Sequence, residues 1–369
     1  MRGNSMDERT ITDNTKMIMK AKGVSIRALA EQISMSPASL SKILNNNVSL
    51  KTSNLIKISK ALQVPLEHLF AEAPRLHQVR FRTQRVMSAR EKAQRGQILR
   101  DTALWMRDYT FLESVTSENL SSFLTSHVFP SNPKEAAAEL RRVLNLSETC
   151  VIYDAFSALV EQCGVKLRLY PFGLKKSFGL SIGSQDGGPA IVVNNDPEVS
   201  VERQIFTIVH EIGHLIMHHD SFQLDEPLST EKEESDADLF AGNFLLPDEA
   251  LRNQWEEKGA LSFVDRVLAI KLLYKVSYKV VLSRYKQLFS PGFNIYAKFA
   301  SDYAKEYNHN LKDHYEPFPL ERPAAIESRL PSLAKKAFLN EKLSFSRVQH
   351  ILGLTIEQAQ ELVWSWKEL

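Results

Sequence analysis

One short interval of strand-like alternation interrupts a chain whose apolar residues otherwise recur at helical spacing. Three segments in this interval read as strands, namely 165–172, 178–182 and 190–193. Helical spacing returns at Val201 and continues to about Pro247, and most of the remaining chain is also patterned for helices. The pattern therefore predicts a mainly α fold with a small β-sheet, in the α+β class.

The 369 residues have the composition of a globular protein, with 43% hydrophobic and 24% charged residues. Their number indicates two or three domains. No run of about 20 uninterrupted apolar residues occurs, which argues against a transmembrane helix and a membrane partner. The polar segment 1–15 does not look like a secretory signal. Only Cys150 and Cys163 are present, without a CxxC pair, which favours a reducing, cytoplasmic setting and disfavours a cysteine metal site.

Charge is distributed unevenly along the chain. Residues 1–100 contain 18 Lys and Arg against 7 Asp and Glu, whereas 28 basic and 37 acidic residues remain in 101–369. The first part therefore carries a net charge of +11 and the rest a net charge of −9. A basic first quarter is typical of a nucleic-acid-binding domain, although a solvated basic surface would show the same balance.

Within this basic part, residues 25–45 have the proportions of a helix-turn-helix. Ser25 is a suitable cap for one helix, and Ser36 followed by Pro37 is suitable for the start of the next. The second helix of such a unit enters the major groove and contacts base edges with its first turns. The polar side chains predicted to contact bases are Ser39, Ser41, Lys42 and Asn45. Those predicted to contact phosphates are Arg27, Asn46, Asn47 and Lys51.

A small helical interaction module with a polar face is the alternative for this region. However, the segments SIRALAEQISMSPASLSKILNN and LIKISKALQVPLEHLF resemble the Cro/C1-type (XRE) helix-turn-helix domain. The resemblance covers most of residues 11–70 and implies binding to double-stranded DNA, usually as a homodimer on two half-sites. The helix predicted to enter the major groove has few long side chains. This departs from the family pattern and predicts weak base-specific contacts.

The most specific chemical signal is the run His210-Glu211-Ile212-Gly213-His214 in an amphipathic helical pattern. Two histidines four residues apart lie on one helix face and can direct ring nitrogens at one cation. Zinc held by three protein ligands acidifies water and polarises a carbonyl group. Glu211 lies near the same face and could act as general base. The alternative is a pair of surface histidines without a metal ion.

A third ligand is expected downstream, and two arrangements are open. Asp220 lies six residues after His214, but Met217 stands where that arrangement needs a helix-breaking glycine. In the other arrangement, a helix over 231–247 supplies Glu234, and Asp238, four residues on, hydrogen-bonds a histidine ring. The competing acidic residues are Glu231, Glu233 and Asp236. His218 and His219 could be extra ligands, although an exposed histidine pair at a helix end is the stronger alternative. Tyr170, Lys175 and Lys176 could bind substrate or stabilise an oxyanion.

The segments VERQIFTIVHEIGHLIMHH and ESDADLFAGNFLLP resemble the ImmA/IrrE family of metallo-endopeptidases. The resemblance extends from about Pro130 to Pro247, and it implies a minimal gluzincin-like peptidase fold. It also implies Zn²⁺, with Mn²⁺ as an alternative, as the metal ion. By residue match, the implied ligands are His210, His214 and Glu234, and the implied base is Glu211.

Four regions are expected: a helix-turn-helix domain (1–75), a helical connector (76–145), a zinc peptidase domain (146–250) and a helical C-terminal region (251–369). The connector begins with a crowd of basic residues that includes Arg80. The end of the C-terminal region, 343–366, has helix-turn-helix rhythm, and we expect it to serve packing or dimerisation rather than DNA binding.

The combined pattern predicts a cytoplasmic regulator that binds DNA and carries a zinc endopeptidase. Its expected substrate is a repressor or another regulator in a stress, mobile-element or defence response. The alternative is a transcription factor, or an antitoxin-like autorepressor, whose metal domain is a sensor or an inactive scaffold. An intact HExxH motif together with Glu234 favours catalysis.

Overall fold

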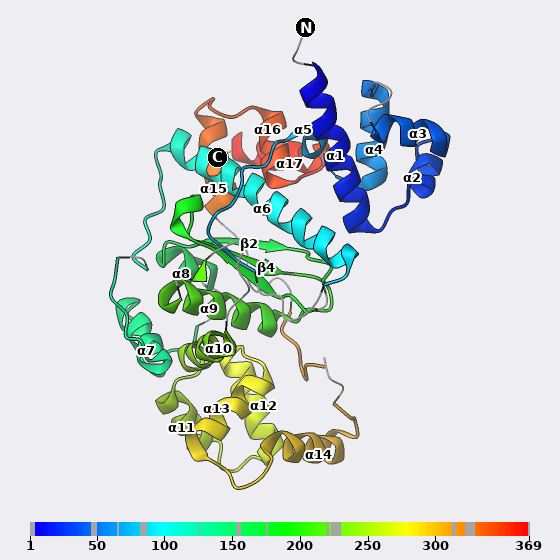
Figure 1. Cartoon of the computed structure of the whole chain (residues 1–369). Helices are drawn as coiled ribbons and strands as arrows, with labels where there is room; N and C mark the ends of the chain where they lie inside the picture. Colours follow the sequence, from blue (N-terminus) through cyan, green and yellow to red (C-terminus); the bar gives the residue numbers. More distant parts are fainter. Residues whose placement is uncertain are drawn as a thin grey trace.

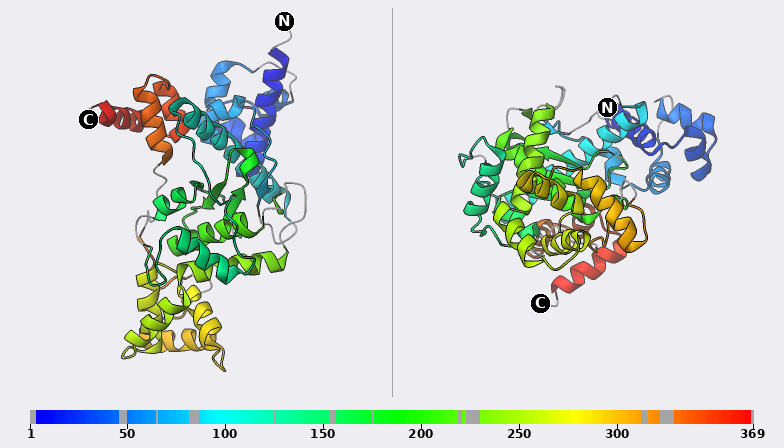
Figure 2. Two further views of the ribbon diagram at one scale, coloured as in Figure 1. Left: turned by 90° about the vertical axis from the view of Figure 1, so that its left-hand side faces the viewer. Right: turned by 90° about the horizontal axis from the view of Figure 1, so that it is seen from below.

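The computed structural model describes residues 4–45, 50–64, 66–81, 87–124, 126–152, 156–174, 176–218, 221–222, 230–311, 315–321 and 329–367. The molecule is elongated, with the N-terminal helices at one end and the sheet in the middle (Figures 1 and 2). Helices α11–α14 form the opposite end. Mostly helical secondary structure with one small sheet confirms the predicted α+β class. Among the described residues, no helix is both long and apolar enough to cross a membrane.

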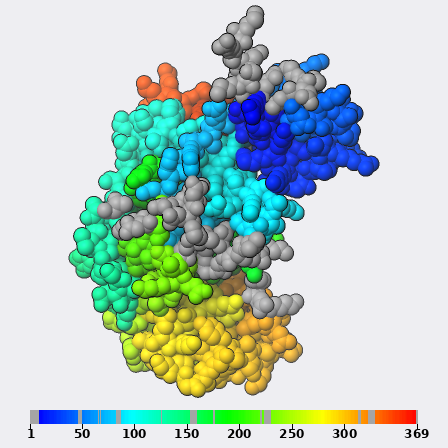
Figure 3. Space-filling view, in the orientation of Figure 1, coloured from blue at the N-terminus to red at the C-terminus, as the bar shows by residue number. Residues whose placement is uncertain are grey.

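The N-terminal head is a bundle of five helices: α1 (Asn4–Lys22), α2 (Ile26–Gln32), α3 (Pro37–Leu44), α4 (Thr52–Leu62) and α5 (Leu66–Phe70). The predicted caps are present, because Ser25 accepts a hydrogen bond from the Ala28 amide and Ser36 accepts one from the Ser39 amide. Buried aliphatic side chains such as Ile18 fill the bundle. The head stands out as a separate lobe in the space-filling view (Figure 3) and contacts the body through α1 and α6 (Ala89–Thr116).

The sheet has four strands: β1 (Val79–Arg80), β2 (Lys166–Tyr170), β3 (Gly179–Ile182) and β4 (Ala190–Asn194). Their order is β1-β3-β4-β2, with β2 parallel to β4 and β3 antiparallel to both of its neighbours. Three of these strands match the predicted segments. β1 lies within the range read as a helical connector, because two residues are too few to produce an alternating pattern.

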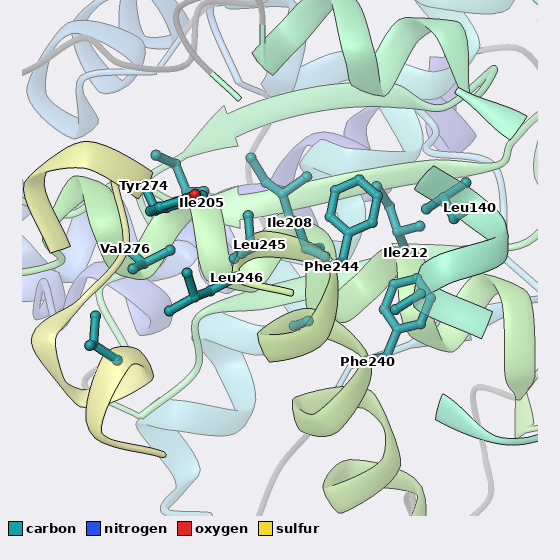
Figure 4. Close-up of a cluster of buried hydrophobic side chains, with 14 of the residues drawn as sticks. Leu140, Ile205, Ile208, Ile212, Phe240, Phe244, Leu245, Leu246, Tyr274 and Val276 are labelled. Atoms are coloured by element: carbon teal, nitrogen blue, oxygen red, sulfur yellow. The ribbon is translucent and has the colours of Figure 1, made fainter. Parts of the chain in front are cut away.

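Two helices place the candidate site on this sheet. They are α9 (Val201–Met217) and α10 (Glu231–Leu245), which pack against each other. Helix α7 (Pro133–Val143) packs against both of them. Ile208 and Ile212 of α9 lie next to Phe240 and Phe244 of α10 in the core (Figure 4). A Cβ atom at Gly213 would lie 2.9 Å from the Phe240 ring, so glycine at this position permits the close helix contact.

On the other side of the sheet, α6 packs against the C-terminal helix α15 (Arg329–Leu339). The last two helices, α16 (Phe345–Leu352) and α17 (Ile356–Lys367), pack against α15 and against each other. Buried side chains of α6 and of the C-terminal helices form a second hydrophobic core, to which Val363 and Trp366 of α17 belong. This is consistent with a packing role for the end of the chain. Arg347 donates a hydrogen bond to Asp108 of α6 at 2.6 Å. The C-terminal helices therefore support α6, the helix that contacts the N-terminal head.

The remaining helices are α8 (Phe156–Gln162), which contacts β2, and a cluster at the far end of the molecule. The cluster consists of α11 (Asp248–Glu257), α12 (Phe263–Tyr274), α13 (Tyr278–Phe289) and α14 (Ile295–Tyr307). It is tied to α9 by the fully buried Lys271, whose ammonium group lies 2.7 Å from Glu202.

Candidate metal centre

Two helices bring together three side chains that could hold a metal ion. His210 and His214 come from α9, and Glu234 comes from the first turn of α10. The Nε2 atoms of the two rings lie 3.0 Å apart. Glu234 Oε2 lies 3.4 Å from His210 Nε2, and Glu234 Oε1 lies 3.5 Å from His214 Nε2. One ligand atom from each residue thus falls within 4.8 Å of the others.

Local sequence explains how Glu234 reaches this position. Thr230 and Glu233 form a capping box, with the Thr230 hydroxyl accepting from the Glu233 amide and the Glu233 carboxylate accepting from the Thr230 amide. This box sets the start of α10, so the next residue lies on the face that meets α9. Asp236 is half-buried on a different face and does not belong to the cluster of three.

The donor set fits a divalent metal ion such as zinc. Two imidazole nitrogens and one carboxylate are common protein ligands of a catalytic zinc ion. His210 Nδ1 lies 2.8 Å from Asp238 Oδ1, and a neutral ring that donates there has its Nε2 lone pair free for a metal ion. Asp238 is thus in the position predicted for a residue that orients a histidine ring.

Burial and local charge act differently on the two histidines. Burial lowers the pKa of His214 well below its usual value. Burial also disfavours the charged form of His210, but hydrogen bonds to Asp238 and Glu234 outweigh it and raise the pKa of His210 to about 9. A metal ion that binds here therefore competes with a proton on His210.

Glu211 is held beside the three candidate ligands. Its Oε2 accepts a hydrogen bond of 2.6 Å from the hydroxyl of Ser181 on β3. Burial raises the pKa of Glu211, with His210 and Ser181 acting in the opposite direction. A Cβ atom at Gly179 would lie 2.5 Å from Thr207 and 3.1 Å from Glu211 Oε1, so the strand approaches the helix closely because this residue is glycine.

Arg80 is a component of this centre that sequence reasoning did not single out. Its Nη2 lies 3.1 Å from Glu234 Oε1 and 3.3 Å from Glu233 Oε2, and the residue is only 5% exposed. The pairing of Arg80 with Ser181 across β1 and β3 brings the guanidinium group to α10. Sequence pattern offered little sign of this role, because Arg80 is one basic residue among many in its segment.

The other candidates lie away from the ligand face. His218 Nδ1 lies 2.9 Å from His214 Nδ1, on the side of the ring opposite Nε2. Tyr170 donates a hydrogen bond of 2.5 Å to Asp101 of α6, and Lys176 is exposed. The remaining candidates, His219, Asp220 and Lys175, lie outside the described residues.

The predicted DNA contacts lie on α2, α3 and the residues that follow them. The exposed side chains among them are Arg27, Ser39, Lys42 and Asn45, and Ser41 is half-buried. Lys51, at the start of α4, is also exposed. Asn46 and Asn47 lie outside the described residues.

The fold and the site define a helix-turn-helix protein with a metallopeptidase-like domain. Comparison with known families agrees with this class. Residues 16–69 match a helix-turn-helix family, and residues 131–286 match the M78 peptidase family, described as the IrrE N-terminal-like domain. The chain therefore combines an XRE-type helix-turn-helix domain with an IrrE N-terminal-like peptidase domain. No curated protein shows significant similarity to the chain.

Proposed function

We propose that this protein is a DNA-binding regulator whose second domain is a zinc-dependent endopeptidase. One observation carries the proposal: a buried carboxylate, Glu211, lies beside the candidate ligands His210, His214 and Glu234. A structural metal site has no need of such an additional carboxylate. The proposed substrate is a repressor or another regulator protein in a stress, mobile-element or defence response.

In this proposal, a bound divalent ion supplies Lewis acidity that polarises the peptide carbonyl and acidifies water. Glu211 removes a proton from the water and transfers it to the leaving amine. A pKa raised by burial makes Glu211 a stronger proton acceptor than a solvated carboxylate. The hydrogen bond from the Ser181 hydroxyl fixes the carboxylate group of Glu211 through Oε2. The orientation of the second oxygen, Oε1, is therefore fixed as well. Asp238 fixes the orientation of the His210 ring.

The head supplies the DNA-binding half of the proposed function. Its match to a helix-turn-helix family and the exposed polar residues of α3 support major-groove binding. We propose that the protein acts as a homodimer on two half-sites in the cytoplasm. In this proposal, Arg27 and Lys51 contact phosphates, and Ser39 and Lys42 contact bases.

The test compares the wild-type chain with Glu211→Gln in cells. New protein N-termini that appear with the wild type and not with Glu211→Gln identify substrates, and at least one is expected in a transcriptional regulator. Glu231→Gln is the matched control, because it makes the same chemical change at an exposed residue at the start of the neighbouring helix, α10. The purified Glu211→Gln protein should retain its metal ion and its affinity for DNA.

One observation favours a second candidate function, a metal sensor. The centre is closed, since His214 is 1% exposed and Glu211 is 6% exposed. For a sensor, the wild type and Glu211→Gln would give identical sets of protein N-termini. Metal removal would then change the affinity for DNA instead.

A further inference from the structure

Arg80 lies outside both segments that match known families, yet its side chain reaches the candidate metal centre. It is held there by a short segment that is fixed on both sides. The amides of His77 and Gln78 donate to Asp186 Oδ2 at 2.7 and 2.6 Å, and the Gln78 carbonyl accepts from the Gly183 amide at 2.8 Å. The backbone therefore holds Arg80 in register with β3.

The two oxygens of Glu234 have different surroundings. Oε2 lies 3.4 Å from His210 Nε2, and Oε1 lies 3.5 Å from His214 Nε2, so both oxygens face the pair of ring nitrogens. Arg80 Nη2 lies 3.1 Å from Oε1. A charge-assisted hydrogen bond to Oε1 leaves Oε2 as the oxygen with which Glu234 can bind a metal ion.

A purely structural ion pair does not account well for this arginine. Among the residues that the structure describes, Nε and Nη1 of Arg80 are buried and have no hydrogen-bond acceptor. Leaving buried donors of a charged group unpaired is costly, and such groups recur at functional sites. The guanidinium group is retained in the centre despite this cost.

We propose that Arg80 is a positioning residue that restricts Glu234 to one-oxygen coordination of the metal ion. Two histidines and one carboxylate oxygen then provide three ligand atoms, and one coordination position stays free for water. Without Arg80, both oxygens of Glu234 are available, and their binding together with water raises the coordination number from four to five. This inference rests on the proposed metal centre of His210, His214 and Glu234.

The deciding measurement is the visible absorption spectrum of the full-length protein loaded with Co²⁺ in place of zinc. Four-coordinate Co²⁺ absorbs visible light much more strongly than five- or six-coordinate Co²⁺, so band intensity reports the number of ligand atoms. Metal affinity alone is less informative. Replacing Arg80 removes a charge that repels the ion as well as the contact that orients Glu234, and these two effects oppose each other.

We expect a strong, four-coordinate spectrum for the wild type and a clear loss of intensity for Arg80→Gln. Arg80→Lys keeps a cationic donor for Oε1 and should restore the strong spectrum. Arg329→Gln is the control, because it removes an ion pair with Glu113 that lies between α15 and α6, away from α9 and α10. Its spectrum should equal that of the wild type.

An Arg80→Gln protein that binds Co²⁺ with the wild-type spectrum would overturn the inference. If Arg80→Gln does not fold, the wild type still tests the idea, because a weak five- or six-coordinate spectrum would show that Glu234 already binds through both oxygens. A wild-type protein that binds neither Co²⁺ nor Zn²⁺ would instead contradict the proposed metal centre itself.

Discussion

The helix-turn-helix head and the candidate metal centre place their functional side chains in opposite surroundings. In the head, Arg27, Ser39 and Lys42 are exposed and lie on two adjacent helices close in sequence. In the metal centre, His214 is 1% exposed and Glu234 is 5% exposed, and the contributing elements are α9, α10, β1 and β3.

This difference predicts how each region responds to substitution. Exposed residues that do not share partners act independently, so their losses add and each loss is modest. Buried residues in direct contact are coupled, because removal of one leaves the polar atoms of the others unpaired. We therefore expect graded losses in the head and severe losses in the metal centre.

The largest effect is expected for His214→Ala. The wild-type protein should contain about one divalent metal ion per chain. The variant should contain none, because the two remaining ligands, His210 and Glu234, do not retain zinc. Elemental analysis of the purified proteins measures the metal content. His77→Ala is the control, because the His77 side chain is 61% exposed. A wild-type protein without metal, even after reconstitution with Zn²⁺, would contradict the prediction.

The next effect separates the acidic residues of α10. Glu234→Gln should lower metal affinity strongly, because a neutral amide replaces a ligand carboxylate. Asp238→Asn should cost roughly 10–100-fold, as is typical for residues that orient a ligand. Asp236→Asn should be nearly silent. Competition with a chromophoric chelator measures the metal affinities of the three variants. If Asp236→Asn lost the metal ion and Glu234→Gln kept it, the assignment of Glu234 as a ligand would be wrong.

In the head, we expect salt-sensitive binding of the full-length protein to duplex DNA from its own upstream region. Arg27→Ala should reduce the slope of log affinity against log salt by about 0.9, the contribution of one neutralised phosphate. Lys42→Ala should relax discrimination between sequences by roughly 1–3 kcal/mol. Lys286→Ala, an exposed change on α13, should alter neither quantity. Binding that does not depend on salt would argue against a DNA-binding role for the head.

The smallest effect is expected for Ser36→Ala. This change removes the hydroxyl that accepts from the Ser39 amide at 3.1 Å and should lower the free energy of unfolding of the head by about 1 kcal/mol. Chemical denaturation followed by circular dichroism measures the change. Ser36→Asp can cap the same helix and should largely preserve stability. An equal loss in both variants would mean that the cap is not the cause.

Much of the fold could be predicted from local pattern. The three longer strands follow from alternation and β-branching, and α2 and α3 begin at the serines that suit their caps. The relation of His210 to His214, and of Glu234 to Asp238, also follows from helical periodicity, because four residues make about one turn of helix. Each of these features depends on residues close together in sequence.

The residues that were missed reach the site across long separations in sequence. Ser181 and Glu211 are 30 positions apart, and Arg80 and Glu234 are 154 positions apart. Ser181 looks like an ordinary strand residue, and Arg80 looks like one of many solvated basic residues. Neither shows its role until β3 is packed against α9 and β1 is paired with β3.

The sequence by itself determined the two domain families, the helical register of the candidate ligands and the polar face of the head, because short-range periodicity and motif spacing encode them. Tertiary structure decided that Glu234 rather than Asp236 faces the histidines, that Ser181 holds Glu211, and that Arg80 contacts Glu234. The physical reason is that strand pairing and helix packing bring distant segments into contact, and burial then makes charges and hydrogen bonds act over a few ångströms.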